Sequence, residues 1–350
     1  MSEEEFENPE DLGQNLVSGN SELETGNIER PVAGLNVDPV MLRAERVKAE
    51  IGQVIVGQED MLDLLLVALF TGGHVLLEGV PGIAKTLTAK LLARTIHSDF
   101  SRIQFTPDLM PADVVGTSVF NMKKSDFSFK AGPIFSNIVL IDEINRAPAK
   151  TQSSLFEVME ERQVTVDGIT HIMVAPFFVV ATQNPIEQEG TYKLPEAQLD
   201  RFLFKVILSY PTLEEEQSIL RRFQNDFSGE LSTSVKPILS PADIADCQHI
   251  IEKVYIREEL LDYIAAIVHN TRNNADLFLG ASPRASLALM KSSKAVAAMA
   301  GRNFVTPDDI RYVSFPVLNH RVILTPEREM EGYTTREVLD DIVRKIEVPR

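Results

Sequence analysis

The sequence predicts an α/β core followed by an all-α domain, and three observations point to this fold class. Five short segments rich in apolar and β-branched residues alternate with helical patterns before residue 210, which is typical of a parallel sheet covered by helices on both faces. A glycine-containing loop at residues 79–86 joins the first of these segments to a helical pattern. From Pro211 onward the strand signals cease and only helical patterns follow, which predicts a separate helical domain.

The elements of the core can be placed in order. Helical patterns begin at Pro39 and at Glu59. Further helices are expected at residues 85–96, 149–161 and near 196–201. Strands are expected at residues 74–78, 102–105, 138–142, 177–183 and 204–208, which would form a five-stranded parallel sheet between helices. Because ligands bind at the carboxyl ends of such strands, we expect a site where Gly79, Asp142 and Asn184 stand.

Two segments interrupt this alternation and are predicted to form hairpins. Residues 116–132 alternate in character around a polar turn at residues 123–126. Residues 163–166 and 171–174 flank Asp167-Gly168, a dipeptide typical of a type I′ turn. Both inserts lie between core strands, where a loop facing a pore or a partner could be mounted, although plain surface decoration is the alternative.

The remaining helices are expected at residues 213–227, 242–254, 258–272, 283–300, 307–319 and near 336–346. Ser240 and Thr306 each precede a proline and fit the N-cap position of the helix that follows. The predicted organisation is therefore a disordered acidic tail at residues 1–38, the α/β core at 39–210 and the helical domain at 211–350.

Composition and charge exclude several function classes. Hydrophobic residues make up 44% of the 350-residue chain, so it is globular. The net charge is −17, and residues 1–38 carry −9 of it, with ten acidic side chains and one arginine. This acidic balance disfavours general nucleic-acid binding, which depends on neutralising phosphates, and the composition of residues 1–38 is typical of disorder.

The same survey indicates the compartment. Cys247 is the single cysteine, which excludes an internal disulfide and suits a reducing compartment. No apolar stretch is long enough to cross a bilayer, and no signal peptide is visible, so we expect a cytoplasmic protein without direct membrane insertion. The six histidines are scattered along the chain, so no metal-binding His/Cys cluster is expected.

Residues 79–86 predict a phosphate-binding loop, with a short Gly/Pro turn as the alternative. Its backbone N–H groups and the positive end of the next helix would hold anionic phosphates. Lys85 would reach the β- and γ-phosphates of a nucleotide, and the Thr86 hydroxyl would bind Mg²⁺. Ala84 stands where this pattern has glycine, at a cost of about 1–2 kcal/mol if the position needs a positive φ. The expected nucleotide contacts are Gly79, Val80, Pro81, Gly82, Ile83, Ala84, Lys85, Thr86 and Leu87.

Two further strand ends supply the groups that hydrolysis of a triphosphate needs. Asp142 and Glu143 follow a buried strand, and adjacent carboxylates there need a cation or solvent to be tolerated. Asp142 suits Mg²⁺, partly through water, and Glu143 suits activation of the attacking water. Asn184 at the next strand end could hydrogen-bond that water and the γ-phosphate, or else form a turn before Pro185.

Two arginines are candidates for contacts with the γ-phosphate. Arg201 closes a short helix and could reach a neighbouring subunit's nucleotide as an arginine finger, a group worth roughly 10³–10⁵ in rate in GTPases. Arg284 lies in the first turn of a helix, where a cation is unfavourable unless an anion compensates it. A surface ion pair is the alternative for each.

In this order, these residues resemble the AAA+ ATPases over residues 40–350, with Walker A at 79–86, Walker B at 138–143, sensor 1 at Asn184, the arginine finger at Arg201 and sensor 2 at Arg284. Finer motifs resemble the MoxR family, near magnesium chelatase motor subunits. They are the alanine form of the loop, Phe105-Thr106-Pro107-Asp108-Leu109-Met110-Pro111-Ala112-Asp113, Asp142-Glu143-Ile144-Asn145-Arg146-Ala147, Met159-Glu160-Glu161-Arg162-Gln163-Val164-Thr165 and Glu189-Gly190-Thr191-Tyr192. The two inserts resemble the helix-2 insert and the pre-sensor-1 hairpin of that clade.

The resemblance implies ATP and Mg²⁺ as cofactors and a ring of subunits, expected to be a hexamer. It adds Val56, Gly57 and Gln58, between the first two helices, to the ATP-binding set, and leaves open whether Arg284 acts within its own subunit or across the interface. It also implies a chaperone that remodels a client protein with a partner bearing a von Willebrand factor A (VWA) domain. A nucleotide-gated scaffold with weak turnover and a DNA motor of the same clade are the alternatives.

Overall fold

The computed structural model describes residues 34–80, 82–123, 125–185, 191–226 and 233–349, which lie within one compact unit from Pro31 to Arg350. Pro81 and nearly all of the predicted acidic tail lie outside the described residues. The predictions for the tail and for Pro81 therefore stay predictions, as do the boundaries at residues 39–210 and 211–350.

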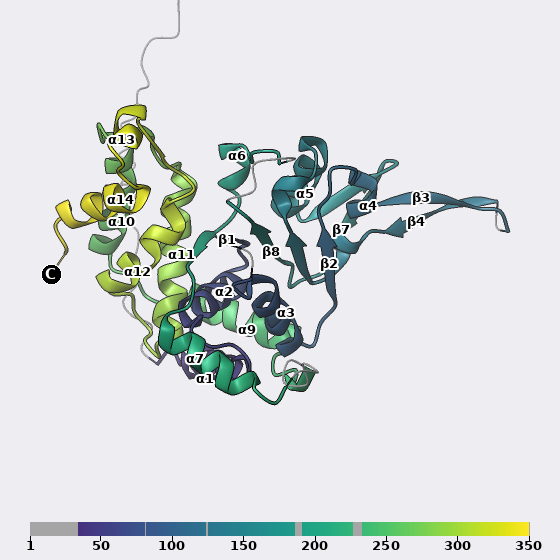
Figure 1. The fold of residues 1–350 in the computed structure, drawn as a ribbon, viewed down its shortest axis with the longest axis horizontal. Helices are drawn as coiled ribbons and strands as arrows, with labels where there is room; N and C mark the ends of the chain where they lie inside the picture. Colours follow the sequence, from purple (N-terminus) through teal and green to yellow (C-terminus); the bar gives the residue numbers. More distant parts are fainter. Residues whose placement is uncertain (1–33, 81, 124, 186–190, 227–232, 350) are drawn as a thin grey trace, which may run out of the picture. The chain divides into compact units, whose positions relative to one another are not determined.

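The centre of the unit is the predicted five-stranded parallel sheet (Figure 1). Its order is β2-β5-β8-β1-β9, and every neighbouring pair is parallel. The bounds are β1 (Val75–Gly79), β2 (Phe100–Gln104), β5 (Ile138–Asp142), β8 (Phe178–Gln183) and β9 (Phe204–Leu208). These match the expected strands to within two residues at each end. The order brings the ends of β5, β8 and β1 side by side, as the site prediction requires.

Alternate residues of each strand enter two different cores, because successive side chains point to opposite faces. Leu76 and Val179 join the core on one face, together with Phe156 of α5 (Ala149–Glu161). Val75 and Val180 join the larger core on the other face, which includes α1 (Asp38–Gly52), α2 (Glu59–Thr71) and α3 (Lys85–Thr95). The short helices α4 (Pro111–Val115) and α6 (Glu196–Leu199) and the 3-10 helices η1 (Pro133–Phe135) and η2 (Ile144–Arg146) complete the helices before residue 210 in the described part.

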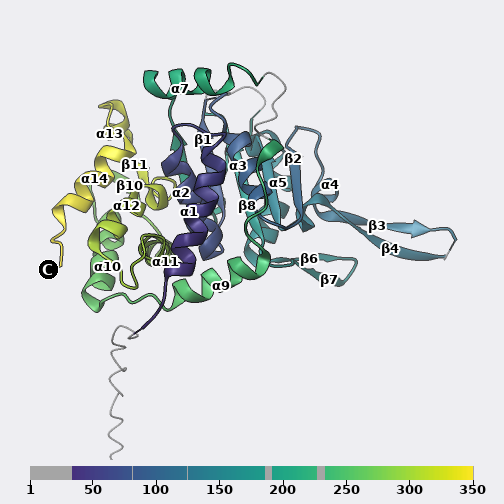
Figure 2. The ribbon, with the colours of Figure 1, turned by 90° about the horizontal axis from the view of Figure 1, so that it is seen from below.

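Both predicted hairpins are present and project from the same side of the core (Figure 2). The first pairs β3 (Gly116–Asn121) with β4 (Asp126–Ala131), and the second pairs β6 (Gln163–Val166) with β7 (Ile169–Ile172). Asp167 and Gly168 have φ of 50° and 77°, as a two-residue type I′ turn requires. The second strand therefore starts at Ile169 rather than at His171. Phe129 stacks on His171 at 4.0 Å between ring centroids, so the two hairpins touch.

The part of the chain after residue 210 is mainly helical, as expected. It contains α7 (Leu213–Phe223), α9 (Pro241–Glu252), α10 (Glu258–Arg272), α11 (Pro283–Met299), α12 (Pro307–Leu318), α13 (Pro326–Met330) and α14 (Thr335–Lys345). A small antiparallel ribbon of β10 (Leu277–Leu279) and β11 (Ile323–Leu324) joins them. Strands of two or three residues show no sequence periodicity, so the pattern did not predict this ribbon.

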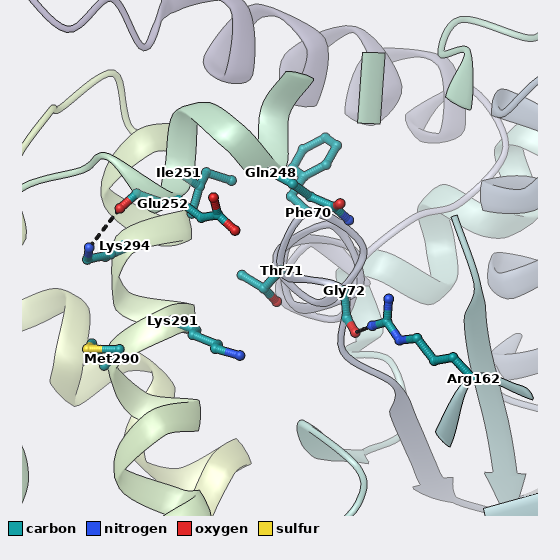
Figure 3. A pocket seen from close by; sticks show the side chains of 10 residues that line it. All are labelled: Phe70, Thr71, Gly72, Arg162, Gln248, Ile251, Glu252, Met290, Lys291 and Lys294. Atoms are coloured by element: carbon teal, nitrogen blue, oxygen red, sulfur yellow. Dashed lines mark hydrogen bonds between the residues drawn. The ribbon is translucent and has the colours of Figure 1, made fainter. Parts of the chain in front are cut away.

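Helices α7 and α9 lie against the first helices of the chain. Arg222 of α7 donates to the Ile55 carbonyl at 3.0 Å, and Gln248 of α9 donates to the Leu69 carbonyl near the end of α2 at 3.1 Å. A pocket of about 330 Å³ lies at that end of α2, and Figure 3 shows the side chains that line it. Arg162 donates to Gly72 there at 2.7 Å, and Lys294 donates to the Glu252 carbonyl at 3.0 Å. These cations complement the negative ends of α2 and α9.

Candidate active site at the carboxyl ends of the strands

The loop between β1 and α3 has the backbone that the phosphate-binding pattern predicts. Gly82 has φ of 87°, and Ala84, directly before the helix, has φ of 61° and ψ of 15°. The position that usually holds glycine is therefore left-handed in this chain, and alanine occupies it at a cost of about 1–2 kcal/mol. The left-handed turn places Lys85 and Thr86 in the first turn of α3, at the positive end of the helix.

A cleft of about 390 Å³ collects the residues predicted for phosphate and water. It is lined by Gly82, Ala84, Lys85, Thr86, Leu87, Arg102, Gln104, Asp142, Glu143, Thr182, Gln183 and Asn184. The Lys85 ammonium donates to the Gly79 carbonyl and to the Gln183 carbonyl, the latter at 3.1 Å. These bonds hold the ammonium between the loop and the end of β8.

Asp142 is buried at the floor of this cleft, and its partners explain how a buried carboxylate is tolerated. Its Oδ1 accepts from the hydroxyls of Thr86 at 2.8 Å and Thr182 at 3.2 Å. Its Oδ2 accepts from Arg102 Nε at 2.6 Å. A charged partner and two hydroxyls offset much of the desolvation cost. Thr86 and Asp142 present a hydroxyl and a carboxylate to the cleft, the oxygen donors that Mg²⁺ takes while it keeps several waters.

Glu143 follows in a backbone conformation that is rare for its type, with φ of 58°. Its N–H donates to Thr182 Oγ1 at 3.1 Å, which helps to hold this left-handed turn. Its Oε2 accepts from Gln104 Nε2 at 2.9 Å and lies 2.9 Å from Arg146 Nε. Such strain costs on the order of 1–3 kcal/mol and is found where the surroundings over-determine the backbone.

Sequence patterns missed Arg102, Gln104 and Thr182 as site residues. Arg102 and Gln104 lie on β2, whose register puts Gln104 opposite Asp142. The available signal was their spacing of two on a strand at the edge of the sheet, since side chains two apart point to the same face. Thr182 was the polar residue two before Asn184 in a buried strand.

Val56, Gly57 and Gln58 line a second cleft, of about 380 Å³, rather than the phosphate cleft. Arg222 of α7 also lines it. A Cβ on Gly57 would lie 2.2 Å from Glu215 Oε1, so α7 covers this backbone closely. The structure does not bring residues 56–58 into the cleft that holds Lys85 and Asp142.

Arg201 and Arg284 lie near the amino ends of the strands, opposite the carboxyl ends that form the cleft. The N–H of Leu203, two residues after Arg201, donates to the carbonyl of His74 at the start of β1 at 2.8 Å. Arg284 makes a two-point contact with Glu160 of α5, at 2.7 and 3.2 Å. A five-residue strand is about 16 Å long. The length of β1 therefore separates the amino ends of the strands from the phosphate loop that follows β1. Neither arginine lines the cleft of its own chain.

Known families match this arrangement. The ATPase family associated with various cellular activities (AAA) matches residues 74–204, and the AAA lid domain matches residues 269–342. YeaC of Bacillus subtilis is 47% identical over 299 residues, with 85% of this chain and 92% of YeaC covered. Chaperone MoxR1 of Mycobacterium tuberculosis is 43% identical over 315 residues, with 87% and 82% covered.

The chain belongs to the MoxR family of AAA+ ATPases. A crystal structure of a Cytophaga hutchinsonii protein described as an ATPase has a TM-score of 0.82 and 45% identity, over 90% of this chain and 97% of that one. Nucleotide binding and ATPase activity in general follow from this membership. In the part of the chain that the structure describes, no helix has the length and apolar character needed to cross a membrane.

Proposed function

We propose that this MoxR-type ATPase hydrolyses Mg²⁺-bound ATP at the interfaces of a ring, proposed as a hexamer, and uses the energy to remodel client proteins. One observation carries the proposal. One cleft contains Lys85, Thr86, Asp142, Glu143 and Asn184. The two arginines predicted to contact phosphate, Arg201 and Arg284, lie near the opposite ends of the strands. A neighbouring subunit that presents its arginine edge to this cleft would complete the site, as heterologous ring contacts allow.

In this site, each residue has a distinct role. Residues 79–87 surround the phosphates, with the Lys85 ammonium on the β- and γ-phosphates. Thr86 and Asp142 would hold Mg²⁺, which would neutralise charge on the phosphates when bound. Glu143 accepts a proton from the attacking water, and Asn184 orients that water.

The neighbouring subunit supplies Arg201, which stabilises charge on the transferring phosphoryl group. Arg284 joins it across the same interface once its contact with Glu160 opens. The separate cleft at Val56, Gly57 and Gln58 is the proposed site for the base of the nucleotide.

The hairpins are the proposed working surface for clients. Phe120 and Phe127 on the β3–β4 hairpin are 48% and 68% exposed, and their rings pack at 5.1 Å. An apolar pair on a projecting arm can contact non-native or partly assembled proteins. The relative named Chaperone MoxR1 supports this use. A VWA-domain partner and a cytoplasmic location complete the proposal.

The test is the ATPase rate per subunit as a function of protein concentration, with Arg201→Ala beside the wild type. A shared site predicts a rate that rises with concentration and collapses in Arg201→Ala. Glu143→Gln should retain ATP binding and lose turnover, since it keeps the shape of the side chain but not its basicity. Undiminished turnover in Glu143→Gln would remove that residue from the mechanism.

A scaffold that binds ATP but turns over slowly is the second candidate, and one contact favours it. Gln104 and Arg146 both contact Oε2 of the Glu143 carboxylate, so this oxygen already has two partners. A rate near zero at every concentration, with ATP still bound, would favour the scaffold. A DNA motor is disfavoured by the net charge of −17, and an ATPase rate stimulated by DNA would reverse that judgement.

A further inference from the structure

Three consecutive polar residues after α12 are buried, although none of them is among the described residues that line the nucleotide cleft. Asn319, His320 and Arg321 are 9%, 5% and 7% exposed. Each makes a hydrogen bond to the segment that carries Arg201. Asn319 donates to the Lys205 carbonyl at 2.9 Å, and His320 Nε2 lies 3.0 Å from the Phe202 carbonyl.

Arg321 makes the most extensive of these contacts. Its Nε pairs with Asp200 Oδ1 at 2.7 Å, and its Nη2 donates to the carbonyls of Phe202 at 2.6 Å and Asp200 at 3.2 Å. Its Nη1 donates to the Leu203 carbonyl at 3.2 Å and to the Val317 carbonyl in the last turn of α12. The guanidinium therefore hydrogen-bonds to backbone carbonyls on both sides of Arg201.

Asp200 connects Arg321 to α11, the helix that carries Arg284. Ser282, the N-cap of α11, donates its hydroxyl to Asp200 Oδ2 at 2.9 Å. The two oxygens of one carboxylate thus tie the segment before Arg201 to Arg321 and to Ser282. A buried guanidinium is stable only when its fork of donors is satisfied, so moving residues 200–203 away from Arg321 is costly.

We propose that Arg321 is a positioning residue that holds the Arg201 segment in register with the helical domain, so that a movement of this domain moves Arg201 toward or away from the neighbour's γ-phosphate. The inference rests on the proposed shared site. Arg321 does not line the nucleotide cleft of its own chain. It fixes where Arg201 can reach.

The position of these residues gives the proposal a distinctive consequence. A substitution at Arg321 should slow hydrolysis in the site of the next subunit and leave ATP binding in the cleft of its own chain unchanged. Arg321→Lys keeps the charge but loses the fork. Its kcat should fall about 10- to 100-fold, the range that a misplacement of about 1 Å can cost, with ATP affinity unchanged.

The experiment mixes variants in equal amounts and measures the ATPase rate. Glu143→Gln cannot hydrolyse in its own cleft but presents an intact Arg201 edge. Mixed with Arg321→Lys, it should restore about a quarter of the wild-type rate, because about one interface in four then joins an intact cleft to an intact arginine edge. Arg201→Ala mixed with Glu143→Gln is the reference and should recover to the same level.

Matched variants separate positioning from general stability. Arg302 pairs with Asp309 at 2.6 Å in the same helical part of the chain and does not contact residues 200–205 in any hydrogen bond described. Arg302→Lys should therefore keep its kcat. Asp200→Asn removes the ion pair but keeps the backbone acceptors, and it provides the test if Arg321→Lys does not fold. It should show a loss of kcat that mixing restores.

The outcomes are distinct. If Arg201→Ala is rescued and neither Arg321→Lys nor Asp200→Asn is, Arg321 is structural and the inference is wrong, while the shared site stands. The inference is also wrong if Asp200→Asn keeps full activity, or if Arg321→Lys binds ATP more weakly. If Arg201→Ala itself is not rescued, the shared site is wrong and the inference falls with it.

Discussion

His74 makes the protein sensitive to mild acid, and the size of the effect follows from its surroundings. The imidazole is fully buried at the start of β1, where Nδ1 accepts from the Val179 N–H at 3.1 Å and Nε2 faces the Met159 carbonyl at 3.3 Å. An N–H can only donate and a carbonyl can only accept, so the neutral ring with its proton on Nε2 satisfies both. A second proton would meet the Val179 N–H.

Burial, which outweighs the hydrogen bond to Met159, and the nearby charge of Arg162 together lower the pKa of His74 from 6.5 to about 4. The unfolded chain therefore binds a proton below about pH 6.5, but the folded chain does so only near pH 4. Stability is full above pH 6.5 and is lost as pH falls through this window. Between pH 7.5 and pH 5.0, His74 should remove about 2 kcal/mol of the free energy of unfolding.

The assay is urea unfolding of the wild type and His74→Gln at both pH values. A glutamine amide can still accept from Val179 and donate to Met159, but it does not titrate. The wild type should lose about 2 kcal/mol more than His74→Gln over this pH range. Burial also lowers the pKa of His320, but that contribution is common to both proteins and cancels. Equal losses in the two proteins would refute the reasoning.

Two further predictions concern the cleft. Ala84→Gly should raise the free energy of unfolding by about 0.5–1 kcal/mol, because relief of left-handed strain outweighs the greater entropy of the unfolded chain. Urea unfolding measures this, and a destabilised variant would show that the backbone at Ala84 is not strained. Thr182→Val should slow ATP turnover at least about tenfold while ATP still binds, since it removes the acceptor of the Glu143 N–H and a buried unpaired group costs about 1–3 kcal/mol. Unchanged kcat in Thr182→Val would mean that this hydrogen bond does not hold Glu143 in place.

Local patterns were sufficient to predict the strands and the phosphate loop. Strands β1, β5, β8 and β9 are short, mainly apolar runs, whereas three of the five residues of β2 are polar. Lys85 and Thr86 follow β1 after one short loop. The carboxyl ends of parallel strands lie at the same end of the sheet, so the contact between Asp142 and Thr86 also followed from the fold class. Glu143 and Asn184 also follow strand ends in the sequence, so the same argument placed them beside Asp142.

Contacts that depend on register or on distant segments could not be predicted this way. Arg102 reaches Asp142 because β2 pairs with β5 in one register, and a different register would move that side chain elsewhere. Arg321 lies far along the chain from Asp200 and follows a helix with no motif around it. Its burial depends on tertiary packing between the end of α12 and β9, which no local pattern reports.

Strained left-handed residues serve a different purpose in the cleft than elsewhere in the fold. In the described part of the chain, five residues other than glycine have positive φ. Ser125 and Asp167 lie in hairpin turns and Arg162 ends a helix, where left-handed backbone changes the chain direction. Ala84 and Glu143 both line the phosphate cleft. Ala84 orients the start of α3 behind the phosphates, and Glu143 is turned back toward Thr182. Strain at these two positions therefore pre-organises the groups that meet the nucleotide, so relaxing either one should reduce turnover more than ATP affinity.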